Sequence, residues 1–110
     1  MLTVVPRTTV NPDTRTVQFQ GREFGTELSF FLIDCEPGQG PALHQHPYAE
    51  MWVTMSGRAL VVAGDEEREV GPEDMVIVGP GTPHRFVALG PDRLNVICLH
   101  DSGEMITEWL

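Results

Sequence analysis

Three histidines and one glutamate stand at spacings that could hold a metal ion. His44, His46 and Glu50 lie together in the segment GPALHQHPYAEMW, and His84 lies in GPGTPHRF. Imidazole nitrogens and carboxylate oxygens bind divalent transition metals in proteins. An ion with only four protein ligands keeps open positions for water, substrate oxygen atoms or dioxygen. These residues therefore indicate binding or activation of a small molecule at a metal ion.

Strands must position these side chains. Residues two apart on a strand point to the same face, so His44 and His46 can bind one ion together. A turn at Pro47-Tyr48 follows them, and we expect Glu50 to come from the adjoining strand. His84 is distant along the chain, and a sheet that folds back on itself would bring it to the same point.

The rest of the chain has the pattern of short strands and tight turns. Eleven glycines and nine prolines fit frequent turns. Turn residues recur about every eight to twelve positions, which is typical of an all-β sandwich or barrel. The predicted strands cover residues 17–20, 28–35, 50–55, 59–63, 68–70, 75–78, 86–89 and 94–100.

The last ten residues predict a short C-terminal helix. Asp101 or Ser102 can cap it, and Asp101 with Glu104 resembles a capping box. Met105 and Trp109 are four residues apart and would share one face of the helix. A helix this short is marginal alone, so it must dock on the barrel or on a partner.

The first histidine segment matches the signature of a known family. Read from Gly38, it has five residues, His44, one residue, His46, three residues, Glu50, six residues and Gly57. This pattern resembles the first signature of the cupin superfamily at every position.

The second segment resembles the second cupin signature in part. Gly81 is followed by two residues and then by His84, as in the family. The family usually has proline at the position of Gly79, glycine at Glu73 and asparagine at Ala88. These departures concern the shape of a loop, because the ligand position itself is kept.

The resemblance implies a cupin-type double-stranded β-helix, a jelly-roll β-barrel. Residues 1–110 would form a single cupin domain, with motif 1 at about 38–57 and motif 2 at about 73–88. The chain would be a metal-binding metalloprotein with one divalent transition metal per chain (Fe, Mn, Zn, Ni or Cu). The expected metal ligands are His44, His46, Glu50 and His84.

Two functions remain open. The chain can be a metalloenzyme for a small organic substrate, with a dioxygenase-like or isomerase/lyase-like reaction. Alternatively, it can bind or sense a small molecule without turning it over. Related cupins include both kinds of protein, and the fold does not choose between them.

Strand alternation predicts the side chains around the ion. Trp52 and Thr54 have the same parity as Glu50, and Phe86 has the same parity as His84, so all three should face the interior. With Tyr48 from the loop between the ligands, they form the expected substrate pocket.

The candidate catalytic groups are Glu50 and Tyr48, which are the nearest acid–base side chains to the expected open positions. Arg85 should point away from the interior by alternation. His100 lies at a strand end, and we expect it to lie away from the site as a surface or hydrogen-bonded core residue.

The composition limits the partners. The net charge is −9, with sixteen acidic residues, seven arginines and no lysine. Such an acidic surface disfavours nucleic acid and anionic membranes as partners. The N-terminus lacks the pattern of a signal peptide, so we expect a cytoplasmic protein. Cys35 and Cys98 lie in apolar runs and are expected to be reduced and buried.

Two strands carry more apolar surface than one core requires. In 28–33 and 50–55, both faces are mostly apolar. Burial on both sides means that something covers the outer face. We expect a homodimer, and the alternative is a terminal segment folded over that face.

Overall fold

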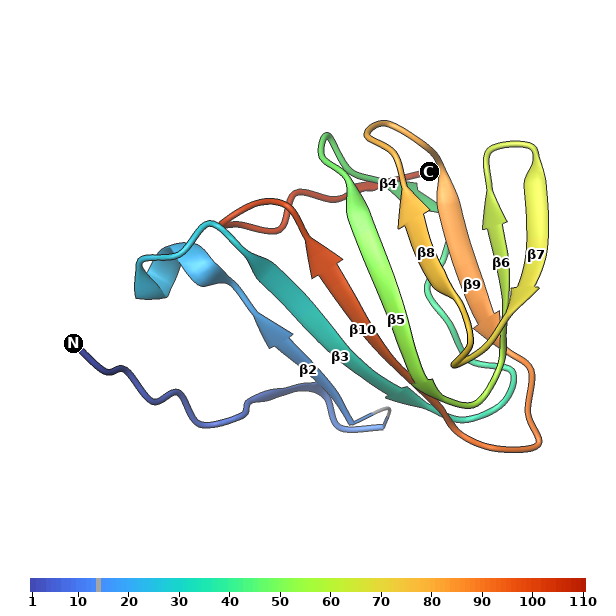
Figure 1. Cartoon of the computed structure of the whole chain (residues 1–110), viewed down its shortest axis with the longest axis horizontal. Coiled ribbons are helices and arrows are strands. Elements are labelled where there is room, and N and C mark those ends of the chain that lie inside the picture. The colour runs from blue at the N-terminus through green and yellow to red at the C-terminus, as the bar shows by residue number, and fades with distance from the viewer. Residues whose placement is uncertain (14) are drawn as a thin grey trace.

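The computed structural model describes residues 1–13 and 15–110, and strands dominate this part of the chain (Figure 1). A 3-10 helix, η1 (Gly21–Phe24), is the one helical element among these residues. The strands are β1 (Thr9–Asn11), β2 (Thr16–Phe19), β3 (Ser29–Cys35), β4 (His44–Gln45), β5 (Glu50–Ser56), β6 (Ala59–Ala63), β7 (Glu66–Val70), β8 (Met75–Val78), β9 (His84–Ala88), β10 (Leu94–His100) and β11 (Glu108–Trp109).

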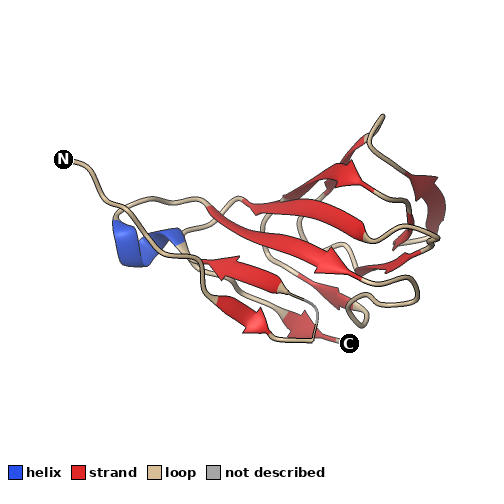
Figure 2. Cartoon of the chain, turned by 90° about the horizontal axis from the view of Figure 1, so that it is seen from below, coloured by secondary structure: helices blue, strands red, loops and turns tan. Residues whose placement is uncertain are grey.

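The strands form two antiparallel sheets that face each other (Figure 2). The six-stranded sheet has the order β1-β2-β3-β10-β5-β8, and the five-stranded sheet has the order β11-β4-β9-β6-β7. Chain neighbours such as β4 and β5 lie in different sheets, which is the crossing pattern of a jelly roll. The predicted all-β jelly-roll barrel is confirmed.

The core lies between the sheets, and strict alternation fills it. In β10, Leu94, Val96, Cys98 and His100 are buried, whereas the residues between them are partly exposed. β5 alternates in the same way from Glu50 onward. Because the period of a strand is two, this register decides which polar side chains face inward.

Register also brings the functional residues side by side. In the five-stranded sheet, His44 of β4 pairs with His84 of β9. In the six-stranded sheet, Glu50 of β5 pairs with His100 of β10. The two pairs face each other across the barrel interior.

The predicted C-terminal helix is wrong. Residues 101–104 form a bend, and β11 pairs with β4, with Trp109 opposite His44. From Met105 onward, the backbone of this segment bonds to distant groups. Met105 N–H donates to Gln20 Oε1 at 3.0 Å, and Ile106 N–H donates to the Tyr48 hydroxyl at 3.2 Å. These tertiary bonds outweigh a helix of marginal intrinsic stability.

A glycine permits the close approach of two chain segments at the end of β5. Gly57 has a φ of +82°, and a Cβ at this position would lie 2.4 Å from the carbonyl oxygen of Arg93. A side chain is excluded both by the backbone conformation and by the space. The second glycine of the first signature is therefore a requirement of the barrel.

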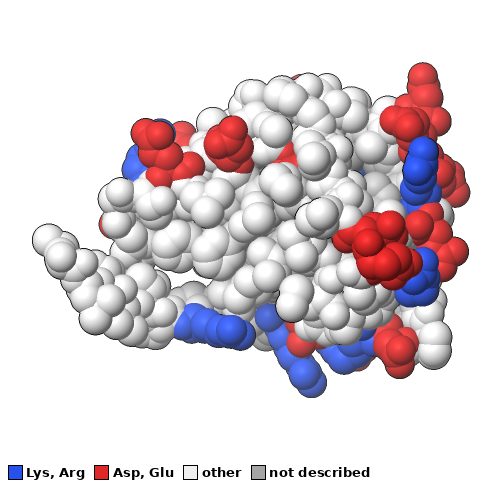
Figure 3. All heavy atoms as spheres, in the orientation of Figure 1, with Lys and Arg blue, Asp and Glu red and all other residues white. Residues whose placement is uncertain are grey.

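The outer face of the six-stranded sheet is apolar. Met51 and Met55 of β5 and Met75 and Ile77 of β8 are exposed, the last two at 76% and 70%. In Figure 3 this face is turned to the viewer, and its middle is largely white, whereas charged side chains gather at the right-hand, lower and upper left edges. In the part of the chain that the structure describes, no helix has the length and apolar character needed to cross a membrane.

Candidate metal centre

The four predicted ligands come together inside the barrel. His44, His46 and His84 come from the five-stranded sheet and its β4–β5 connection, and Glu50 comes from the first position of β5. All four side chains are buried: His44 is 7% exposed, His46 3%, His84 1% and Glu50 4%. One donor atom from each lies within 4.8 Å of the others. Donors on opposite sides of one ion are about 4.2 Å apart at bond lengths of about 2.1 Å, so the space fits an ion.

Backbone carbonyls fix the tautomer of all three histidines. Each ring has Nδ1 within hydrogen-bond distance of a carbonyl oxygen, which can only accept. Nδ1 therefore carries the proton, and the lone pair of Nε2 is left for a ligand. The pairs are His44 with Ala42 (2.7 Å), His46 with Ile106 (2.8 Å) and His84 with Thr82 (2.8 Å).

The atoms that face the centre lack protein partners. Within the described residues, Nε2 of His46, His84 and His100 and Oε2 of Glu50 are buried without a hydrogen bond. Unpaired buried polar atoms are costly, and the Nε2 lone pairs of His46 and His84 together with a carboxylate oxygen suit a cation. The side chains present therefore fit a divalent metal.

The carboxylate of Glu50 is the electrostatic centre of the cluster. Its Oε2 lies 2.9 Å from His84 Nε2 and 3.6 Å from His46 Nε2, and its Oε1 lies 2.8 Å from His100 Nε2. Burial alone would raise the pKa of Glu50, but the contacts of His100 and His84 more than offset it and hold the pKa far below its ordinary value. Glu50 is therefore an anion at neutral pH.

The histidines respond differently to the same surroundings. Burial lowers the pKa of His44 and His46, and their backbone hydrogen bonds oppose this shift in part. Burial also lowers the pKa of His84, but the contact with Glu50 and the Thr82 carbonyl reverse the effect, and the pKa is raised. Two of the three imidazoles are thus held neutral and ready to bind an ion.

His100 belongs to the cluster, contrary to the expectation from the sequence. It is 1% exposed, and its ring lies 4.6 Å from that of His46 between centroids. Its Nε2 contacts Glu50, although the N–H is not aligned for a directed hydrogen bond. Strand alternation along β10 put it inside, but its position opposite Glu50 depends on long-range pairing that no local pattern reveals.

Tyr48 contacts two histidines of the cluster, His46 and His100. Its hydroxyl lies 2.6 Å from His100 Nδ1 and accepts the N–H of Ile106 at 3.2 Å, and its ring stacks on His46. The hydroxyl proton is left for Nδ1 of His100, which puts the ring proton on Nε2, toward Glu50. Tyr48 thus connects the C-terminal segment to the centre.

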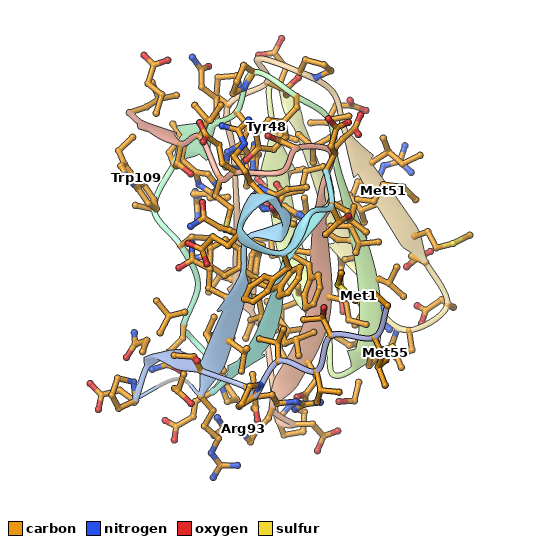
Figure 4. The ribbon with its side chains drawn as sticks, turned by 90° about the vertical axis from the view of Figure 1, so that its left-hand side faces the viewer. Met1, Tyr48, Met51, Met55, Arg93 and Trp109 are labelled. Atoms are coloured by element: carbon orange, nitrogen blue, oxygen red, sulfur yellow. The ribbon has the colours of Figure 1, made fainter. Side chains whose placement is uncertain are left out.

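A cavity of about 620 Å³ adjoins the four candidate ligands. Three of them, His44, His46 and Glu50, line it. Of the predicted pocket residues, Trp52 and Phe86 line it, whereas Tyr48 and the buried Thr54 are not part of the lining. Trp109 lines it too, with its ring 5.0 Å from that of His44. Figure 4 shows Tyr48 between the sheets and Trp109 on the side away from the outward-pointing Met51 and Met55.

Both cysteines border this cavity as free thiols. Cys35 and Cys98 are buried and unpaired with each other, as predicted. Burial raises the pKa of both thiols, so they are protonated and inert at neutral pH.

Comparison with known proteins decides the family. The profile of the cupin domain family matches residues 31–100, which include all four ligand positions and His100. This chain belongs to the cupin family. Among curated proteins, this cupin is 31% identical to the uncharacterized protein MJ1618 of Methanocaldococcus jannaschii over 62 residues, 56% of this chain and 50% of that protein.

Solved structures give the same result. Oxalate decarboxylase from Bacillus subtilis at pH 4.6 superimposes on this cupin with a TM-score of 0.77 and 26% identity, over 86% of this chain and 27% of that one. A structure of the same enzyme from work on its Mn(II) centres has a TM-score of 0.73, 26% identity and coverage of 83% and 26%. This cupin thus spans about a quarter of the length of the decarboxylase chains and half of the archaeal relative.

Proposed function

We propose that this cupin is a metalloenzyme that acts on a small organic substrate at an ion held by His44, His46, Glu50 and His84. The observation that carries the proposal is that these donor groups meet at the wall of a cavity large enough for a small organic molecule. A structural metal site is usually closed, whereas a site beside a cavity can accept a substrate.

The donor set suits catalysis as well as binding. Three neutral imidazoles and one carboxylate leave about one positive charge on a dication and two open positions on an octahedral ion. When bound, the ion would polarise a substrate oxygen or activate a bound water or dioxygen molecule. Fe, Mn, Zn, Ni and Cu all accept these ligands, and the Mn(II) centres of the decarboxylase support a metal of this group.

The residues around the centre favour chemistry that the metal itself carries. Glu50 is an anion held between histidines, and the Tyr48 hydroxyl is engaged by His100 and the backbone of Ile106. Neither is free to act as a general acid or base in the cavity. A dioxygenase-like reaction, which needs no such group, therefore fits better than an isomerase-like or lyase-like one.

The second candidate is a binding or sensing protein without turnover. It is favoured by the same lack of a free acid–base group. Oxygen uptake and substrate loss, measured with iron-loaded protein and a panel of small diketones, catechols and hydroxy acids, separate the two functions. Turnover that the His84→Ala variant loses supports the enzyme, and stoichiometric binding without turnover supports the alternative.

We also propose that the chain forms a homodimer through the outer face of the six-stranded sheet. The exposed side chains of Met51, Met55, Met75 and Ile77 form the apolar part of this face at β5 and β8. The N-terminal segment lies over the other end, where residues 5–8 border a hollow with β2 and β3. It leaves β5 and β8 open for a second copy of the chain.

A further inference from the structure

The cavity beside the metal ligands has no cationic wall. Among the described residues that line it, none is an arginine, and the chain has no lysine. Glu50 is the one acidic side chain in the lining. The remaining wall is largely apolar and includes Phe31, Ile33, Trp52 and Phe86.

The seven arginines lie elsewhere. Arg85 is exposed on β9, and Arg7 and Arg68 are exposed and line hollows other than this cavity. The other four are paired with carboxylates on the surface. The pairs are Arg15 with Asp34, Arg22 with Glu104, Arg58 with Glu69 and Glu73, and Arg93 with Asp34 and Glu36.

Charge balance then limits the ligand. A dication with Glu50 and three neutral imidazoles carries about one positive charge. A monoanion brings the buried site to neutrality. A dianion leaves an extra negative charge inside the barrel with no cationic partner, which is strongly unfavourable.

We propose that this cavity binds an organic molecule that carries at most one negative charge and an apolar, ring-sized body, with its oxygen donor on the metal. The inference rests on the proposed metal site and goes beyond it by naming the substrate class. Small dicarboxylates, such as the substrate in the name of oxalate decarboxylase, are excluded from this class. The cavity has an aromatic wall and a volume of about 620 Å³, so it accommodates a ring. A ligand the size of acetate would leave most of this volume unfilled.

The test uses four carboxylates as probes of the zinc-loaded protein in titration calorimetry. Phthalate and monomethyl phthalate have nearly the same shape and differ by one charge. Benzoate and acetate share one charge and differ in the apolar body. We expect monomethyl phthalate to bind at least ten times more tightly than phthalate, and benzoate at least ten times more tightly than acetate.

A gain of charge provides the matched variants. Val10 lines the cavity and is half exposed, so Val10→Arg adds a cation to the wall without disturbing the core. This variant should bind phthalate several times more tightly. Val4→Arg adds the same charge at an exposed site outside the lining and should leave all four affinities unchanged.

Zinc content is measured first, and its absence would contradict the proposed metal site itself. With zinc bound, tighter binding of phthalate than of its monoester would overturn the charge argument. Equal affinity for acetate and benzoate, or no binding of benzoate at millimolar concentration, would overturn the apolar body.

Discussion

At the scale of single residues, Glu50 is contacted from both sides. His84 lies against Oε2 and His100 against Oε1, at 2.9 and 2.8 Å. With Oε1 occupied by His100, Glu50 can offer Oε2 to the metal. His100 is thus a positioning residue for the carboxylate, and Tyr48 holds His100 in turn.

Removing His100 should weaken metal binding. His100→Leu keeps the buried volume but leaves Oε1 without its partner, and we expect metal affinity to fall by about 10–100-fold. His100→Gln retains an N–H, so its metal affinity should fall less. The metal affinity of Tyr48→Phe should fall least. Calorimetric titration with Zn²⁺ measures the affinities, with the thermal melt of each apoprotein as the control for folding. Native affinity in a folded His100→Leu protein would contradict this role.

Metal binding should also release a proton near neutral pH. A bound imidazole must be unprotonated. The pKa of His84 is raised above the ordinary value of about 6.5, whereas His44 and His46 are already neutral. Affinity should therefore fall as the pH drops through the raised pKa of His84.

The measurement is calorimetry of metal binding in two buffers with different enthalpies of ionisation. We expect a release of one proton or less, and most of it should disappear in His84→Ala. A release close to three protons at neutral pH would mean that all three histidines are protonated in the free protein.

The cluster of four candidate ligands was predictable because most of the information for it is local in the sequence. His44, His46 and Glu50 lie within seven residues, and strand parity fixes their direction. His84 required the second signature. His100 could not be placed in the same way, because its position depends on the pairing of β10 with β5, which is set by the whole sheet.

At the scale of elements, the C-terminal segment completes the site. Ile106 offers its carbonyl to His46 and its N–H to Tyr48, and β11 packs Trp109 against His44. The capping residues and the spacing of Met105 and Trp109 predicted a helix. The predicted helix does not form because backbone groups of this segment bind partners elsewhere in the barrel. Local sequence does not reveal such distant partners.

Deletion of residues 106–110 tests this contribution. The variant loses the acceptor that fixes the tautomer of His46, so metal affinity should fall by about 10–100-fold, as for other supporting groups of metal sites. Deletion of residues 2–6, which are exposed and distant from the ligands, is the matched control and should retain native affinity. Equal affinities in the two truncated proteins would show that the segment does not support the centre.

At the scale of the whole molecule, charge and apolar surface are separated. Acidic side chains and arginines gather around β6 and β7, along the lower edge and at the upper left, whereas the middle of the six-stranded sheet is largely uncharged (Figure 3). The apolar runs in the sequence predicted this outer face. The alternative drawn from the same runs, a terminal segment folded over that face, is met at its β2–β3 end, where the N-terminal segment lies.

The proposed dimer should depend on this face. Ile77→Glu places a charge at a 70% exposed apolar site on β8 and should convert the dimer to a 12.2 kDa monomer. Leu89→Glu makes the same change in chemistry outside the face and should leave the dimer intact. Size-exclusion chromatography with light scattering at micromolar concentration gives the masses. A native protein that elutes as a monomer would contradict the dimer.

The most direct test of the metal centre is anomalous diffraction from a crystal of this protein soaked in a Mn²⁺ or Zn²⁺ salt. We expect one strong peak per chain at about 2.0–2.2 Å from Nε2 of His44, His46 and His84 and from one oxygen of Glu50. A peak at another place, or well-ordered side chains at these four positions with no anomalous density between them, would contradict it.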